Sequence, residues 1–125
     1  MTVYATIVAD PPWPFKDRLP PIGGRRIRGA ATHYRLMTGN AIKSYLAVLE
    51  ATSGIEIAAD ARLFLWRVAA EAELAYEVVR AWGFVPKAEI VWLKERRGGG
   101  AHFGLGRTVR NAHEVCIIGA RGRPE

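Results

Sequence analysis

The chain has 125 residues, of which 50% are hydrophobic and 24% are charged, and this balance excludes disordered and fibrous classes in favour of one globular domain. Its net charge is +6, with 18 Lys and Arg against 12 Asp and Glu, which favours a polyanionic partner. The single Cys116 excludes a disulfide or zinc framework, and no apolar run approaches the length of about 18 residues needed for a membrane span. We expect a soluble, intracellular protein of the cytoplasm, with Cys116 as a small core residue.

The first apolar run, residues 3–9, is rich in β-branched residues and is followed by prolines, so it predicts a strand buried on both faces. Residues 16–38 contain prolines, glycines and six cations but no apolar period, and they predict a long basic loop. A loop of this length inside a compact domain is usually functional. Two explanations of its charge stay open: a solvated loop that keeps the protein soluble, or a surface that contacts phosphate.

The next segment begins at Gly39 or Asn40 and predicts a helix that Gly54 ends, with Asn40 as its N-cap. Its apolar residues recur at helical spacing and should face the core. They are Ile42, Tyr45, Leu46 and Leu49.

Residues 61–68 predict a second strand, and residues 70–83 predict a helix with an acidic first turn and Gly83 at its end. Residues 87–94 and 113–120 predict two further strands, and residues 95–112 between them are a loop rich in Gly and Arg. The apolar stripe of the second helix consists of Leu74, Val78, Val79 and Trp82.

The order of these elements predicts a single α/β domain with an open, mostly parallel sheet. No helix separates the last two strands, so they should form an antiparallel pair at one end of the sheet. Ligands of such sheets bind outside the carboxyl ends of the parallel strands. Asp10 and Trp66, which end the first two strands, are therefore expected on the same rim.

The sequence "VADPPWPF", at the end of the first strand, contains the candidate ligand-binding residues. Proline fixes its own φ and holds the preceding residue extended, so Asp10, Pro11 and Pro12 should form a stiff protrusion with the carboxylate outward. The carboxylate and a proline carbonyl can accept the two N–H groups of an exocyclic amine, while Trp13 stacks on the heterocycle. Two acceptors placed for the more pyramidal amine favour the transition state of its alkylation over the ground state.

A structural interpretation of the same residues is a rigid exit from a strand followed by a surface Trp. We favour the ligand-binding interpretation because an acid precedes the prolines at the end of the first strand. The heterocycle that fits is adenine, whose amine is a poor nucleophile because its lone pair is delocalised into the ring.

Five segments in the same order resemble one known family. This is the adenine-N6 methyltransferases typified by the seventy-kilodalton catalytic subunit of the mRNA N6-adenosine methyltransferase, with their bacterial and phage DNA-adenine relatives. The segments are "VADPPWPF", "HYRLMT", "LFLWR", "AWGF" with "IVWLK", and "GLGRTVRNAHEVCIIGARG". The resemblance implies a permuted, Rossmann-like methyltransferase sheet, of which residues 1–125 form the half that holds the target base. It also implies S-adenosylmethionine as the methyl donor.

Site roles follow from the same resemblance. It implies that Asp10, Pro11, Pro12 and Trp13 form the catalytic motif, and that Asp10 and Pro11 also contact the donor. It places Tyr34 in a loop near the target base. The nucleic-acid contacts would be Lys94, Arg107 and Arg110, and the residues near the adenine would be Asn111 and Glu114.

For several of these residues a structural role stays open. Glu114 can be a buried acid paired with an Arg, and Trp66 and Trp92 can be plain core residues. His102 and His113 have no acid or cysteine at metal-ligand spacing, so they are expected to be loop residues and no metal site is predicted.

Family members usually continue beyond the Arg-Gly segment into strands that supply most of the donor pocket, whereas this sequence ends at Glu125. Strand 3–9 is then expected to expose an unpaired apolar edge, and such edges associate. We therefore expect either that this sequence is truncated and the missing residues cover the edge, or that another chain covers it, a second copy or a different protein.

Two functions follow for a chain of this kind. The first is an enzyme that methylates adenine N6 in nucleic acid, DNA rather than RNA, by direct displacement. The alternative is an inactive, basic, nucleic-acid-binding subunit that partners an active methyltransferase. A small-molecule amine methyltransferase fits the motif but not the basic loops.

Overall fold

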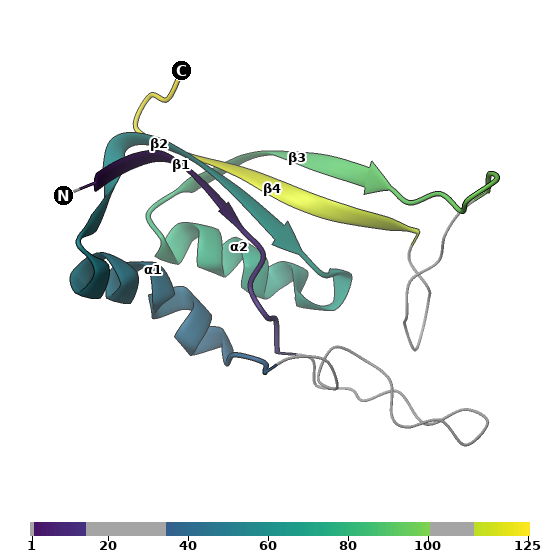
Figure 1. The fold of residues 1–125 in the computed structure, drawn as a ribbon, viewed down its shortest axis with the longest axis horizontal. Coiled ribbons are helices and arrows are strands. Elements are labelled where there is room, and N and C mark those ends of the chain that lie inside the picture. The colour runs from purple at the N-terminus through teal and green to yellow at the C-terminus, as the bar shows by residue number, and fades with distance from the viewer. Residues whose placement is uncertain (1, 15–34, 101–111) are drawn as a thin grey trace.

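In the part of the chain that the structure describes, two helices pack on one face of a four-stranded sheet and leave the other face uncovered (Figure 1). The computed structural model describes residues 2–14, 35–100 and 112–125. None of the helices in these residues has the length and apolar character of a membrane span. The elements are β1 (Thr2–Ala9), α1 (Gly39–Ser53), β2 (Ile55–Arg67), a 3₁₀ turn (Ala69–Glu71), α2 (Ala72–Ala81), β3 (Val85–Leu93) and β4 (His113–Arg121).

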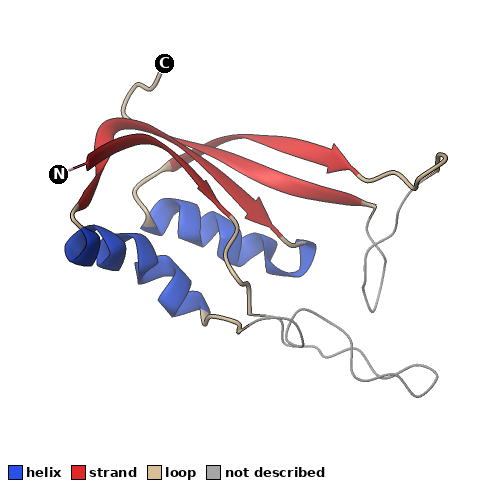
Figure 2. Cartoon of the chain, in the orientation of Figure 1, coloured by secondary structure: helices blue, strands red, loops and turns tan. Residues whose placement is uncertain are grey.

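The strands lie in the order β1-β2-β4-β3. β1 and β2 are parallel, and β4 is antiparallel to both of its neighbours. Three strands therefore run in one direction and β4 in the other, which confirms an α/β sheet with a parallel start and an antiparallel pair at its far end. α1 lies in the connection between β1 and β2, because a parallel pair needs a crossover (Figure 2).

α1 begins at Gly39, two residues earlier than an N-cap at Asn40 would allow. The cap is Thr38, whose side chain accepts a hydrogen bond from the backbone N of Ala41 at 3.1 Å, so the prediction of Asn40 is wrong. The predicted end is confirmed, since Gly54 closes the helix in the left-handed conformation at φ 69°. Ile42 and Leu46 are buried.

The core lies between the two helices and the sheet. α2 contributes Val78 and Val79, and Trp82 follows it and donates its indole N–H to the carbonyl of Ile42 at 2.9 Å. β4 approaches α2 at Gly119, where an added Cβ would lie 3.2 Å from Cγ1 of Val79. A larger residue at this position would therefore require Val79 and its neighbours to shift.

Alternation along the strands separates a covered face from an uncovered one. Leu63, Leu65 and Ile117 are fully buried against the helices, so Phe64 and Trp66, which alternate with them, lie on the uncovered face. This face also carries Ile90 and Trp92 of β3. The exposed fractions there are large: Val8 68%, Trp92 53% and Ile90 46%.

The expectation that strand 3–9 is buried on both faces is wrong. β1 is an edge strand with β2 as its one neighbour in the described sheet, and no described helix covers its outer face. An apolar run of this kind is typical of a central parallel strand, but burial depends on neighbours that the local pattern does not encode. The expectation of an exposed apolar edge, in contrast, is confirmed.

Candidate active site

The predicted rim is present. Ala9, the last residue of β1, lies beside Leu65 of β2, so Asp10 follows at the level of Trp66. Because β4 runs the other way, its first residues reach the same rim, where Trp66 pairs with Cys116 and Trp92 pairs with Glu114. Asp10, Trp66 and Glu114 are thus brought to one end of the sheet from three neighbouring strands.

The segment from Asp10 to Trp13 is fixed at two points beyond β1. The carbonyl of Pro12 accepts a hydrogen bond from the backbone N of Met37 at 3.0 Å, just before α1. The indole N–H of Trp13 donates to the carbonyl of Trp66 at 3.1 Å. Together with the fixed φ of two prolines, these bonds hold the segment while Asp10 remains exposed.

The expected stacking role of Trp13 is wrong for this structure. Its side chain is 1% exposed and belongs to the hydrophobic core, so it presents no face to a ligand. An indole buries a large apolar area, and its polar N–H finds an acceptor in a strand end. Trp13 therefore acts as an anchor that places Asp10, and another aromatic residue is needed for any stacking.

The Asp10 carboxyl lies in an environment that disfavours its charge. Partial burial raises its pKa above the ordinary value of 3.8, and the nearby charge of Glu114 raises it further. Glu114 itself pairs with Lys94 at 2.5 Å, and its side chain is 43% exposed. The alternative of a buried acid paired with an Arg is wrong, because the partner is a lysine and the acid is half exposed.

Two tryptophans lie on the uncovered face beside these acids. The rings of Trp66 and Trp92 meet edge to face, with centroids 6.3 Å apart and an interplanar angle of 76°. The ammonium of Lys94 lies over the Trp92 ring, 5.6 Å from its centroid. Trp66 is half-buried, but the core role considered for Trp92 is wrong, since 53% of its surface is exposed.

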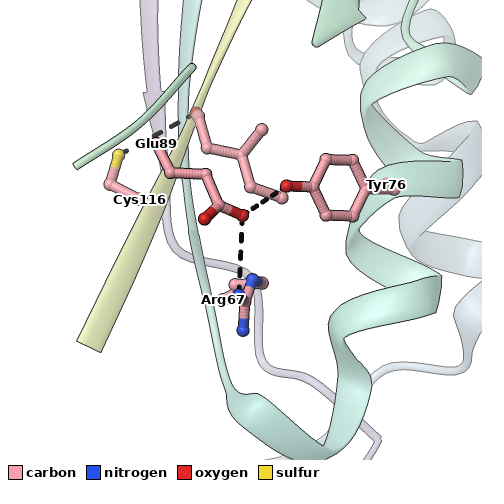
Figure 3. A network of polar contacts seen from close by, with 5 residues as sticks. Arg67, Tyr76, Glu89 and Cys116 are labelled. Carbon is pink, nitrogen blue, oxygen red and sulfur yellow. Dashed lines mark hydrogen bonds and ion pairs between the residues drawn. The ribbon is translucent and has the colours of Figure 1, made fainter. Parts of the chain in front are cut away.

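Behind the rim, a polar network joins β2, α2 and β3 (Figure 3). Glu89 accepts a hydrogen bond from the hydroxyl of Tyr76 and pairs with Arg67 at 3.5 Å. Hydrogen bonding to Glu89 and partial burial raise the pKa of Tyr76. Arg67 is the last residue of β2, so the network fixes this end of the strand. The residue before it, Trp66, provides the carbonyl to which Trp13 donates.

Sequence reasoning did not find the role of Arg67. The available signal was a charged residue directly after the apolar run "LFLW", where a strand buried on one face would otherwise continue. The Nε atom of Arg67 is buried and has no hydrogen-bond partner in the described part of the chain. Burying an N–H donor without a partner costs free energy of folding, and the fold nevertheless keeps the Arg67 side chain in this position.

Several predicted site residues cannot be placed. Tyr34, Arg107, Arg110 and Asn111 lie outside the described residues, as does most of the basic loop 16–38. His102 also lies outside them, while His113 is not a loop residue but the first residue of β4. Among residues 2–14, 35–100 and 112–125, no group of three or more His, Cys, Asp or Glu side chains could hold a metal ion.

Comparison with known proteins gives one consistent result. The family model described as MT-A70 matches residues 4–125. The chain is 26% identical to the N(6)-adenosine-methyltransferase catalytic subunit METTL3 of Homo sapiens over 130 residues, 98% of this chain and 18% of that protein.

Two relatives from other organisms agree with this match. The N(6)-adenosine-methyltransferase MT-A70-like of Arabidopsis thaliana is 25% identical over 98% of this chain and 15% of its own length. The N(6)-adenosine-methyltransferase MT-A70-like protein of Drosophila melanogaster is 23% identical over 97% of this chain and 17% of its own length. The chain thus spans about a sixth of the length of these relatives.

Proposed function

Because this chain belongs to the MT-A70 family, we propose that it takes part in methyl transfer from S-adenosylmethionine to the N6 amine of adenine in nucleic acid. The observation that carries the proposal is the position of Asp10: an exposed carboxylate at the carboxyl end of a parallel strand, on a segment held by Trp13 and Pro12. The names of the relatives, which are N(6)-adenosine methyltransferases, support adenine N6 as the acceptor. The preference for DNA over RNA stays a prediction.

Asp10 has two tasks in this proposal. Its carboxylate accepts a hydrogen bond from the adenine amine and so directs the nitrogen lone pair away from the ring. When the nitrogen becomes positively charged, the same carboxylate stabilises that charge and can take the proton that must leave. Burial and Glu114 raise the pKa of Asp10, which makes it a stronger base for this proton.

The second acceptor for the amine is a proline carbonyl. The carbonyl of Pro12 already accepts from Met37. Within the described residues, no hydrogen bond to the carbonyl of Pro11 is found, so Pro11 is the better candidate for the second acceptor. Two acceptors placed around one amine match its two N–H groups.

S-adenosylmethionine, when bound, supplies an electrophilic methyl group on a positively charged sulfur. The residues present fit such a cation, because Asp10 and Glu114 place two carboxylates at one rim and the charge of Glu114 raises the cost of charging Asp10. A bound cation relieves this repulsion. Asp10 and Pro11 would hold the donor at its methyl-bearing end.

Nucleic-acid contact is proposed for the basic residues near this rim. Lys94 lies there beside Glu114, and the net charge of +6 favours a phosphate backbone. A duplex target would need its adenine turned out of the stack, at a cost of a few kcal/mol. The roles of Tyr34, Arg107, Arg110 and Asn111 stay predictions.

A partner chain is also proposed, because β1 offers an unpaired edge with Val8 68% exposed. The same observation favours the alternative function, an inactive nucleic-acid-binding subunit that completes its sheet with an active methyltransferase. Sedimentation of the purified chain distinguishes the cases: a monomer at every concentration tested argues against pairing with a second copy.

The decisive test is transfer of a labelled methyl group from S-adenosylmethionine to DNA and RNA oligonucleotides of the same sequence. Label should appear with adenine, and not with inosine in its place, since inosine carries an oxygen where adenine has the amine. Asp10→Ala should lose the signal, while Glu56→Ala, which changes an exposed acid of β2 away from the rim, should keep it. Equal label in the wild type and Asp10→Ala contradicts the catalytic role.

A further inference from the structure

Among the described residues, Trp92 is the most exposed aromatic residue at the active-site rim. We propose that Trp92 and Lys94 form a binding site for one unpaired nucleotide that flanks the target adenine, with the indole stacked on its base and the ammonium paired with its phosphate. The inference rests on the proposed function, because it names how the nucleic acid is held beside Asp10. It also assigns base stacking to Trp92, because Trp13 is buried and cannot stack on a base.

The exposure of Trp92 distinguishes it from the other tryptophans of the chain. Trp13 and Trp82 are 1% and 6% exposed and donate their indole N–H groups to backbone carbonyls, whereas Trp92 is 53% exposed. Its edge-to-face contact with Trp66 fixes the ring on the uncovered face. A large aromatic surface held in one orientation in water suits a base, since every base offers a π-face.

Lys94 supplies the charge that a nucleotide requires. Its ammonium lies 5.6 Å from the centre of the Trp92 ring and 2.5 Å from the carboxylate of Glu114. An ammonium has three donors, so it can keep Glu114 and also contact a phosphate oxygen. Trp92 and Lys94, two residues apart along the chain, thus offer base stacking and phosphate contact, the two components of single-strand binding.

The sheet sets the distance between this site and the reaction. Trp92 lies on β3 and Asp10 follows β1, and the order β1-β2-β4-β3 separates them by three strand spacings, about 14 Å. This separation is too large for one base to reach both. At a rise of about 3.4 Å per stacked nucleotide it corresponds to at most about four nucleotides, so the occupant is a near neighbour of the target.

The alternative occupant is another protein chain, because Ile90 and Val8 are also exposed on this face. A protein contact would use the whole apolar surface, away from the rim as well as at it. We favour a nucleotide over a protein chain because the ion pair of Lys94 and Glu114 lies beside the exposed indole of Trp92, where a base and its phosphate would bind together.

The test measures binding of a labelled single-stranded oligonucleotide with one adenine by the full chain, using fluorescence anisotropy. Trp92→Ala should weaken binding by a factor of about 5 to 150, and Trp92→Phe should weaken it less. Leu93→Ala is the matched control, since it removes a 70% exposed apolar side chain from the adjacent position. DNA and RNA forms of the same oligonucleotide decide which nucleic acid is preferred.

An abasic residue is then placed in turn at each position within four nucleotides of the adenine. At one position it should weaken binding by the wild type but not by Trp92→Ala, since stacking on that base is already lost. Lys94→Gln should lower the dependence of log Kd on log salt by about 0.7, the value for one phosphate contact in a single strand. Lys87→Gln, an exposed lysine near the start of β3, should leave that dependence unchanged.

The outcomes separate this inference from the proposed function. Unchanged binding by Trp92→Ala overturns the inference even if the chain methylates adenine. Binding that depends on Trp92 supports the inference even if no methyl group is transferred. If Trp92→Ala abolishes self-association in sedimentation but leaves oligonucleotide binding intact, the surface is a protein contact and the inference is wrong.

Discussion

Trp13 donates its indole N–H to the carbonyl of Trp66 at 3.1 Å, and this bond joins the segment after β1 to the end of β2. Asp10 lies three residues before that anchor, with two prolines between. The position of the proposed catalytic carboxylate therefore depends on a buried side chain rather than on the strand alone.

Trp13→Phe tests this dependence. The change removes the N–H donor, leaves the Trp66 carbonyl without its partner and loses buried area, so we expect a loss of about 1–3 kcal/mol in the free energy of unfolding. Urea denaturation measures it. Trp82→Phe is the control, because it removes an equivalent bond to Ile42. Both variants should be destabilised, but methyl transfer by the folded protein should fall only in Trp13→Phe; equal activities would show that Trp13 is only structural.

Asp10→Asn should lower methyl transfer by a factor of about 10² to 10⁴, because the amide cannot accept the amine proton. The same change should improve stability at neutral pH. The pKa of Asp10 is raised on folding, so the folded wild type binds the carboxyl proton more tightly than the unfolded chain does. This proton binding stabilises the folded state below pH 3.8, and the stabilisation is lost as pH rises through the pKa of the folded state.

Asparagine carries no charge at any pH and avoids this loss. The stability difference between Asp10→Asn and the wild type should therefore grow with pH and then level off, as measured by urea denaturation between about pH 3 and pH 7. A difference that shrinks with rising pH would contradict the assignment.

Glu114→Gln should lower the pKa of Asp10, because it removes the second cause of the upward shift while burial remains. The carboxyl carbon of Asp10, followed by NMR, should titrate at lower pH than in the wild type. The acid limb of the pH profile of methyl transfer should move in the same direction. No movement of either would mean that the two carboxylates do not interact.

Tyr76→Phe should lower the free energy of unfolding by about 1 kcal/mol, the usual value of one hydrogen bond, since it removes the bond to Glu89 behind the rim. Tyr45→Phe, which changes a tyrosine that is 48% exposed on α1, should have no measurable effect. The two variants are compared by thermal or urea unfolding under one set of conditions. Equal stabilities would indicate that the network makes no net contribution.

The sequence determined the elements and the rim of this protein. Apolar period, prolines and glycines predicted both helices and four strands, because these are local signals, and the order of these elements predicted the common rim of Asp10 and Trp66. The sequence-based prediction made β2 too short, because the strand begins at Ile55 rather than at residue 61. The pairing with β1 shifts register between Tyr4, which pairs with Ile57, and Thr6, which pairs with Arg62. This irregularity interrupts the alternation of apolar and polar residues by which a strand is predicted.

Only the tertiary structure decided which aromatic residues are available. Trp13 follows prolines at a chain exit and was expected in solvent, while Trp92 lies in an apolar strand and was considered for the core. The fold reverses both, because Trp13 fills the space under the end of β2, whereas β3 lies at the sheet edge with one face uncovered. Burial depends on which elements pack against a residue, and a single sequence without its neighbours in space does not specify that.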